Sequence, residues 1–582
     1  MRRPRLLLFL IILASAGVYL IGNGSVALWD RDEPRYAQTS RQMLQSGDWV
    51  VPHYLDNVRT AKPVFIYWCQ AAAMNIFGDN AFAARFPSAI AMVLLLIVLS
   101  FALWGHLGPE RTVWTVFIFA TSGLTIAAAK MCITDAVLLL WVTIAQLCLY
   151  AMWRGDRSWP VVITMSIAIG LAGLTKGPVV LGFQATTLLI LAILRWLDRG
   201  LASSTGVSPV SSDLRHGRDA RATAELPLEV SPNVLEYRTP SVKQSLDWPS
   251  ILRKSLVALL IIAAITLPWI ILVNQRAHAF LKTAVGHDVW DRMMTPLEQH
   301  TGPPGYYLIT IWITFFPWSL LLPLVIGLAI RYRAHPHTRF ALAAIIGPWI
   351  MLECIRTKLP HYLLPVFPPL AFLTADALVR NLHRQHDDIR RHGFVIGVGV
   401  FSLLVALAAS APWIVVRAYQ PLPYGAMVAL SILGVVFAIT VFTAFARRRI
   451  AAAVSAMGVG CMLFVVVAYG WYLPRADFLR LSPRIAQVLI DHGVTQPHQV
   501  IMMRYMEPSL AFHQGGTIRE AGDLTLTPRW VDQLPPWIVV ERGVFNQAPA
   551  EVRDQFEVVA DLFGLAYADK GTWMHVLVIH RK

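Results

Sequence analysis

The sequence predicts a mainly α, polytopic membrane protein with about thirteen transmembrane helices and a small α/β domain at its C-terminal end. Hydrophobic side chains make up 56% of the 582 residues and charged ones only 15%, whereas soluble domains are typically roughly a quarter charged. The apolar residues form long runs, as at residues 90–103, 311–330 and 394–416, and a spanning helix needs about 20 mostly apolar residues. After residue 474, short apolar runs alternate with turn residues, which is typical of a small α/β fold.

The chain begins with a basic head that is followed by an apolar run over residues 6–21. This arrangement, with small residues near the end of the run, also fits a signal peptide. The run is slightly longer than the usual apolar region of a signal peptide, which favours an uncleaved first helix. Under either interpretation, the segment that follows is exported.

Thirteen apolar segments are candidate membrane spans. They begin near residues 5, 82, 111, 132, 159, 178, 251, 306, 338, 361, 393, 423 and 449. When the spans alternate from a cytoplasmic N-terminus, 25 Lys and Arg residues fall on the cytoplasmic side, 14 in the outer loops and 11 in the C-terminal tail. Basic residues are enriched in cytoplasmic loops, so the count supports this orientation. It also explains the net charge of +15 without a nucleic-acid partner.

Two regions differ from the membrane segments in composition. Residues 198–250 are rich in Ser, Pro, Arg and Asp without a sustained period, which indicates a disordered cytoplasmic insert. Residues 475–582 contain the short apolar runs of the C-terminal domain. We therefore divide the chain into a transmembrane domain at 1–474, which includes the insert, and a periplasmic α/β domain at 475–582.

The first outer loop, at residues 22–82, is too long for a simple connection, and such loops are usually functional. It carries a cluster of charged side chains near its start: Asp30, Arg31, Asp32, Glu33 and Arg35. Residues 33–44 have the pattern of a helix with Pro34 in its first turn, which is a favoured position for proline. Asp30 or Asp32 would then cap this helix, and the cluster would be only a cap with salt bridges at the membrane interface.

Further charged side chains fall on the same face of the membrane, which argues against that simple explanation. They are Lys62, Lys130, Asp135, Lys176, His287, Asp288, Arg292, Glu298, His300, Arg356, Lys358 and His361, with Tyr362 beside them. Charged residues at membrane depth are functional candidates by default. Lysines and arginines in such a group can hold a phosphate while a carboxylate acts on a hydroxyl group.

Two other interpretations of these residues remain open. An ion transporter also places charges in the membrane, but it puts them near the midplane in broken helices, whereas these lie at helix ends and in loops. A divalent metal could be held by His287 with Glu298 and His300. The spacing permits such a site, although a histidine pair in a wet loop is more often without a metal.

Several motifs together resemble one enzyme family. They are WDRDEPRYAQTSRQMLQSGDWVVPH, the KP before an apolar stretch, LTKGP, HDVWDR and KLPHYLLPVFPPLA. These motifs, in this order, resemble the GT-C glycosyltransferases of the protein O-mannosyltransferase superfamily, and most of all the bacterial lipid A aminoarabinose transferases. The resemblance covers roughly residues 1–475 without the insert. The family has thirteen helices and an outer C-terminal domain, as expected here from the residues.

The resemblance implies roles for particular side chains. Asp32, in the DE pair with Glu33, matches the family's expected catalytic base, and Asp135 matches a second acidic position, so Asp32, Glu33 and Asp135 form the predicted catalytic group. The donor phosphate would be bound by a second group: Lys62, Arg292, Tyr362, Arg35 and Tyr36. The family usually has Glu-Lys-Pro where this chain has Ala61, Lys62 and Pro63. That glutamate is implicated in metal binding beside the histidine that matches His287, so the alanine bears on both the metal and the identity of the substrate.

The resemblance implies an inverting transferase that moves a sugar from a polyprenyl-phosphate donor to an acceptor at the periplasmic face of the bacterial inner membrane. Lipid A is the acceptor of the look-alike enzymes, and another glycan or a protein is the alternative. A transporter or flippase of lipid-linked substrates is the second class of function. Both classes would bind polyprenyl phosphates, but only the enzyme needs Asp32 beside the phosphate site. A nucleotide sugar is not expected, because no nucleotide-binding motif is present.

Overall fold

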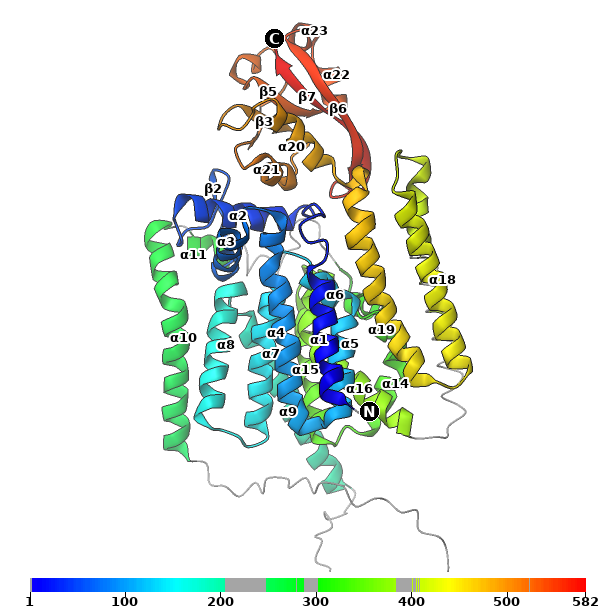
Figure 1. Cartoon of the computed structure of the whole chain (residues 1–582). Coiled ribbons are helices and arrows are strands. Elements are labelled where there is room, and N and C mark those ends of the chain that lie inside the picture. Colours follow the sequence, from blue (N-terminus) through cyan, green and yellow to red (C-terminus); the bar gives the residue numbers. More distant parts are fainter. Residues whose placement is uncertain are drawn as a thin grey trace, which may run out of the picture.

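The computed structural model describes residues 3–204, 247–278, 280–286, 302–383, 409–522 and 524–582, together with positions 400, 403, 405 and 407. The two ends of the predicted insert are helical, since residues 198–204 belong to α9 (Val179–Ser204) and residues 248–250 to α10 (Trp248–Arg276), so the prediction of disorder is wrong there. Residues 205–246 lie outside the described residues, so their predicted disorder stays a prediction. The described chain forms a bundle of long helices, a layer of short elements across one end of the bundle, and a sheet domain above that layer (Figure 1).

The helices of the bundle follow the apolar segments of the sequence. They are α1 (Pro4–Leu20), α4 (Ala81–Leu107), α5 (Pro109–Thr121), α6 (Gly123–Ala129), α7 (Thr134–Trp153), α8 (Trp159–Lys176), α9 (Val179–Ser204), α10 (Trp248–Arg276), α13 (Tyr306–Thr314), η2 (Trp318–Leu321), α14 (Leu322–Arg331), α15 (Pro336–Cys354), η3 (Pro360–Val366), α16 (Phe367–His383), η4 (Ala411–Arg417), α18 (Tyr424–Ala446) and α19 (Ile450–Val467). A helix begins within about three residues of every predicted start except the eleventh, near residue 393, which lies outside the described residues.

The described residues contain eight helices that are long and apolar enough to cross a membrane, or up to ten if each of two bent pairs is one span. The bent pairs are α5 with α6, at 65°, and α13 with the helix over Trp318–Arg331, at 116°. The chain is therefore a multi-pass membrane protein. The full count of thirteen spans stays a prediction, because one predicted span lies outside the described residues.

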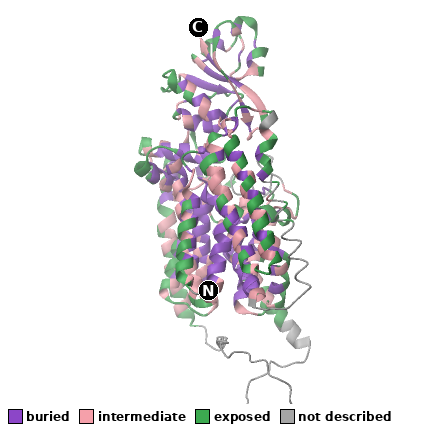
Figure 2. Cartoon of the chain, turned by 45° about the vertical axis from the view of Figure 1, so that its right-hand side comes forward, coloured by how far each residue is buried: buried purple, intermediate pink, exposed green. Residues whose placement is uncertain are grey.

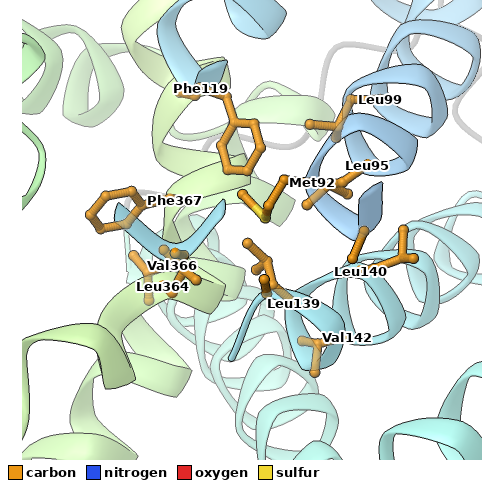
Figure 3. Close-up of a cluster of buried hydrophobic side chains, with 14 of the residues drawn as sticks. Met92, Leu95, Leu99, Phe119, Leu139, Leu140, Val142, Leu364, Val366 and Phe367 are labelled. Carbon is orange, nitrogen blue, oxygen red and sulfur yellow. The ribbon is translucent and has the colours of Figure 1, made fainter. Parts of the chain in front are cut away.

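The core of the bundle is packed from the inward faces of α4, α5, α7 and the η3–α16 segment. Buried side chains from these helices meet at its centre (Figure 3): Met92, Leu95, Leu99, Phe119, Leu139, Leu140, Val142, Leu364, Val366 and Phe367. Figure 2 shows buried residues through the middle of the bundle, with exposed ones on its outside. Gly347 lets α15 approach α9 closely, since a Cβ at this position would lie 2.5 Å from the Thr186 carbonyl oxygen. This packing fixes the ends of the helices relative to one another.

A layer of short elements covers the upper end of the bundle, which is the end nearest the C-terminal sheet (Figure 1). It contains α2 (Asp32–Ser46), the antiparallel pair β1 (His53–Tyr54) and β2 (Asn57–Val58), α3 (Phe65–Phe77) and α11 (Phe280–Val285). The sequence expectation of a helix near residues 33–44 is met by α2. Its N-cap position is Arg31, and no side chain caps it. The expectation that Asp30 or Asp32 caps this helix is therefore wrong.

The C-terminal part of the chain is an α/β domain. A short connection, η5 (Ala468–Tyr472), η6 (Leu473–Arg475) and η7 (Asp477–Leu479), leads from α19 into it. Its further elements are α20 (Leu481–Asp491), β3 (Val500–Met503), α21 (Pro508–Gln514), β4 (Arg519–Glu520), η8 (Val531–Gln533), β5 (Trp537–Glu541), α22 (Arg542–Gln547), α23 (Ala550–Arg553), β6 (Phe556–Ala566) and β7 (Thr572–Arg581). The strand order is β4-β3-β5-β7-β6, with parallel pairing of β3 to β4 and β5 and antiparallel pairing elsewhere. The predicted fold class is confirmed.

Candidate active site at the upper ends of the helices

Asp135 lies at the centre of a charged cluster. It is in the first turn of α7 and is 94% buried. The Nζ of Lys176, the last residue of α8, donates to its Oδ1 at 2.7 Å. The Nε2 of His361, in η3, lies 3.8 Å from its Oδ2. The starts of α7 and η3 and the end of α8 thus bring three titratable side chains together.

Two more predicted residues border this cluster. The Lys176 ammonium lies 4.5 Å from the ring centroid of Tyr362, and that ring meets the His361 ring edge to face at 4.9 Å. Lys62 precedes α3, and its Nζ donates to the Ala61 carbonyl oxygen at 2.8 Å. The Lys62 charge also acts on both Asp135 and His361. The structure therefore brings predicted phosphate ligands and a predicted catalytic carboxylate to one place.

Asp32 faces the same region from the layer above. It is the first residue of α2, where the helix dipole favours a negative charge, and it is exposed. Its charge acts on Tyr36, Arg59 and His361. In the part of the chain that the structure describes, no hydrogen bond or ion pair engages its carboxylate. Asp32 is thus available to a substrate.

Tyr36 forms a wall of the site together with two residues that the sequence analysis did not single out. Its ring stacks on Tyr67 at 5.8 Å, and the Arg59 Nε donates to the Tyr67 hydroxyl at 3.0 Å. The Arg59 guanidinium lies 5.1 Å from the Tyr36 ring centroid. Burial, followed by the proximity of Tyr67, raises the pKa of Tyr36 well above its usual range. Arg59 adds a cation to the site, and only its position three residues before Lys62 could have suggested this.

Glu33 has entirely different surroundings from Asp32. Its carboxylate forms a bidentate pair with Arg85 of α4, at 2.6 and 2.9 Å, and both side chains are fully buried. The backbone N–H groups of Trp29 and Cys132 donate to it at 2.8 and 2.7 Å. Because both oxygens are engaged, this geometry favours a positioning role over the predicted catalytic one. Glu33 ties the start of α2 to α4 and to the segment before α7.

Of the remaining predicted site residues, the structure describes only Arg35. The Arg35 charge acts on Tyr54 and on Glu507 of the C-terminal domain, so Arg35 faces the junction with that domain. Arg292 and the predicted metal ligand His287 lie outside the described residues, as do Glu298 and His300. Among the residues that are described, no group of three or more His, Cys, Asp or Glu side chains could hold a metal ion. The roles of Arg292 and His287 stay predictions.

This arrangement suits one kind of chemistry. Lys62, Lys176 and Arg59 can neutralise an anionic group between the helix ends, with Tyr362 beside it. Charged hydrogen bonds of this kind are the strong ones. The exposed carboxylate of Asp32 can accept a hydrogen bond or a proton from a second substrate.

Comparisons with known proteins agree with this interpretation. Residues 5–210 match the family model of dolichyl-phosphate-mannose-protein mannosyltransferases. Over 98% of its length, the chain superposes on 97% of a crystal structure of ArnT from Cupriavidus metallidurans bound to undecaprenyl phosphate, with a TM-score of 0.70 and 18% sequence identity. The chain has the GT-C fold. The same protein in its apo state gives a TM-score of 0.69.

The curated relatives of this chain include arabinosyl transferases. An undecaprenyl phosphate-α-4-amino-4-deoxy-L-arabinose arabinosyl transferase of Edwardsiella ictaluri is 28% identical over 68% of this chain. The match spans 64% of that relative, which is less than two thirds of its length. A relative of the same name from Pseudomonas paraeruginosa is 29% identical over 73% of this chain and 69% of its own length. The resemblance that the motifs indicate is confirmed.

Proposed function

We propose that this protein is an inverting glycosyltransferase that moves a sugar from a polyprenyl monophosphate to lipid A at the periplasmic face of the bacterial inner membrane. The observation that carries the proposal is the cluster of Lys62, Asp135, Lys176, His361 and Tyr362 at the upper helix ends, with the free carboxylate of Asp32 above it. A lipid-linked phosphate needs a cationic site at this depth, so that its headgroup is bound while its prenyl chain remains in the membrane.

In this proposal the donor phosphate is the leaving group. The acceptor attacks the anomeric carbon in line, the bond from that carbon to the phosphate oxygen breaks, and the phosphate keeps the electron pair. Lys62 and Arg292, assisted by Tyr362, neutralise the charge that develops on the phosphate, which is the usual electrostatic route to rate. Arg35 and Tyr36 complete the predicted phosphate group, and Tyr36 lies beside Arg59 in the wall of the site.

The two aspartates have separate tasks in this mechanism. Asp135 holds Lys176 by a 2.7 Å ion pair and so fixes a cation beside the phosphate. Asp32 orients the acceptor and removes its proton when the acceptor is a hydroxyl group. If the acceptor is a phosphate of lipid A, no proton has to be removed, and Asp32 only positions the acceptor.

The relatives support a particular donor, since they are named for undecaprenyl phosphate-linked aminoarabinose, and the matched structure contains undecaprenyl phosphate. Ala61 replaces the glutamate that is usual beside the lysine in such enzymes, which removes one implied metal ligand. The alternative acceptor is another glycan or a protein, and the alternative class of function is a transporter or flippase of lipid-linked substrates.

Mass spectrometry of lipid A from cells with and without the gene tests the proposal. The expected result is a sugar-sized mass increment that is present only with the gene, and its mass names the sugar. Purified protein should transfer the same sugar from the polyprenyl phosphate to lipid A. Identical lipid A spectra together with donor movement across vesicles, but without cleavage, would support the flippase instead.

A further inference from the structure

The carboxylate of Asp30 is bound by the C-terminal domain. Ser509, the second residue of α21, donates its backbone N–H to Oδ1 at 2.8 Å and its hydroxyl to Oδ2 at 2.6 Å. The Tyr567 hydroxyl donates to Oδ2 at 3.3 Å and accepts the Asp30 backbone N–H at 2.9 Å. These contacts join residues that are far apart in the sequence, and neither the fold nor the proposed mechanism explains them.

Hydroxyl groups of the C-terminal domain extend this contact into its interior. The Ser482 and Ser509 hydroxyl oxygens are 2.6 Å apart, and the Ser482 and Tyr505 hydroxyl oxygens are 2.8 Å apart. Ser482, Ser509 and Tyr505 are all at least 95% buried. A buried network in which each polar group has a partner rigidifies its surroundings. Asp30 is therefore fixed to the body of the C-terminal domain.

The same face of the domain also contacts α2 directly. The Arg41 guanidinium of α2 donates to the Phe512 carbonyl oxygen at 2.6 Å and lies 4.0 Å from the Phe512 ring centroid. The Trp29 ring meets the Tyr567 ring edge to face at 5.4 Å. The C-terminal domain thus holds α2 at its start and along its length.

This contact lies next to the proposed reaction centre. Asp32 follows Asp30 by only two residues of the same backbone, so a shift of Asp30 is transmitted to Asp32. A misplacement of about 1 Å in an active site can cost about a hundredfold in rate. The domain therefore has a direct path by which it can act on the transfer step.

We propose that Asp30, Ser509 and Tyr567 are positioning residues through which the C-terminal domain fixes the Asp32 carboxylate for transfer. This inference rests on the proposed function. None of the three residues lies in the cation cluster that would bind the donor phosphate. Loss of the contact should therefore lower turnover and leave donor binding unchanged.

Two substitutions of Asp30 in the purified full-length protein test this. Asp30→Ala removes the contact and should lower kcat about tenfold or more with an unchanged KM for the polyprenyl-phosphate sugar. Asp30→Asn should keep most of the activity, because its amide oxygen accepts the Ser509 N–H and its amide nitrogen donates to the Ser509 hydroxyl. Burial, followed by the charge of Glu507, raises the pKa of Asp30 to about 7, so a neutral side chain is already tolerated there.

A second pair of variants approaches the contact from the other side. Ser509→Ala should lower kcat, because it removes the hydroxyl that donates to Asp30 Oδ2. Thr525→Ala removes an exposed hydroxyl from the same domain and is the control, with unchanged kcat. If Asp30→Ala and Ser509→Ala lower only the melting temperature while the folded fraction keeps the wild-type kcat, the positioning role is wrong.

Hydrogen exchange gives a measure that does not depend on transfer. Backbone amides of residues 28–36 should exchange faster in Asp30→Ala than in the wild type, and at the wild-type rate in Asp30→Asn. Equal exchange in all three proteins overturns the inference. A wild-type protein that transfers no sugar but shows this pattern overturns the proposed function and leaves the positioning contact intact.

Discussion

Asp32 and Glu33 are neighbours in the chain, yet their carboxylates have opposite surroundings. Asp32 is exposed at the start of α2, whereas Glu33 is fully buried against Arg85. The helix start turns one side chain toward the site and the next into the core between α2 and α4. The acidic pair could be recognised from the sequence. Which of the two carboxylates is buried could not be predicted, because the partner of Glu33, Arg85, is 52 positions away and lies in an apolar segment.

Asp32→Asn should abolish transfer while the protein still folds and binds its lipid donor. Asparagine has nearly the same shape, but it cannot take a proton and carries no charge to orient the acceptor. Turnover and donor binding are measured on the same purified sample. Near-normal turnover would remove Asp32 from the mechanism.

Glu33→Ala should destabilise the protein strongly, because it leaves the Arg85 guanidinium buried without its carboxylate. Breaking a buried ion pair in this way typically costs about 3–5 kcal/mol. The melting temperature and the kcat of the folded fraction are compared with those of the wild type. A variant with the wild-type melting temperature that transfers no sugar would indicate that Glu33 has a catalytic role, as the resemblance implies.

Lys62→Ala should weaken donor binding or turnover by about ten- to a hundredfold, since a charged hydrogen bond to a phosphate contributes roughly 1.5–3 kcal/mol. Arg292→Ala should behave in the same way. Arg447→Ala is the matched control, because Arg447 is equally basic but follows α18 at the opposite end of the bundle. Unchanged affinity together with a lower melting temperature would show that the lysine or arginine only stabilises its loop.

The helices follow from the sequence more directly than the site does. Hydropathy is a local property, so a start near 159 or 306 can be found without knowledge of any partner, and α8 and α13 begin there. The pairing of Asp135 with Lys176 requires the end of α8 to lie beside the start of α7. Alternation of the spans predicts that Asp135 and Lys176 lie on the same face of the membrane, but it does not predict that they are in contact. Tyr67, within the apolar segment of α3, gave no signal at all.

Deletion of residues 205–246 tests the organisation of elements. Their composition predicts a segment without packed structure, and the predicted topology places it between α9 and α10 on the cytoplasmic side, whereas the proposed site faces the periplasm. A deletion that keeps a short flexible linker should leave folding, donor binding and transfer unchanged. Loss of transfer in a stably expressed deletion variant would indicate that this segment has a docking role.

At the scale of the whole molecule, the C-terminal domain and the membrane bundle meet at the loop that carries the proposed catalytic aspartate. The sequence predicted a separate outer domain but not where it docks, because its contacts with Asp30 and Arg41 join residues more than 400 positions apart. Ion pairs strengthen the junction: Arg31 lies 3.7 Å from Glu507, and Arg519 pairs with Asp56. These contacts allow the C-terminal domain to fix the position of the loop that carries the proposed site.

The protonation of Asp30 should make the stability of this junction depend on pH. Burial and the charge of Glu507 raise its pKa from the usual 3.8 to about 7, and the pKa of Glu507 is itself raised by burial. A carboxyl whose pKa is higher in the folded state contributes stability that is complete below pH 3.8 and is lost as the pH rises through about 7. The positive charges of Arg31 and Arg35 lower the pKa of Glu507 and so oppose the effect of burial. The side chains of Tyr505 and Tyr567 face Asp30 as neutral hydroxyl groups.

Asp30→Asn removes this titration and keeps the hydrogen bonds to Ser509. The melting temperature of the variant should therefore rise relative to that of the wild type as the pH increases from about 5 to about 8.5. The comparison is made between the two proteins at each pH, because the rest of the molecule titrates in both. A constant difference across this range would mean that Asp30 is ionised throughout, and that the contact with Ser509 and Tyr567 stabilises its charge more strongly than burial opposes it.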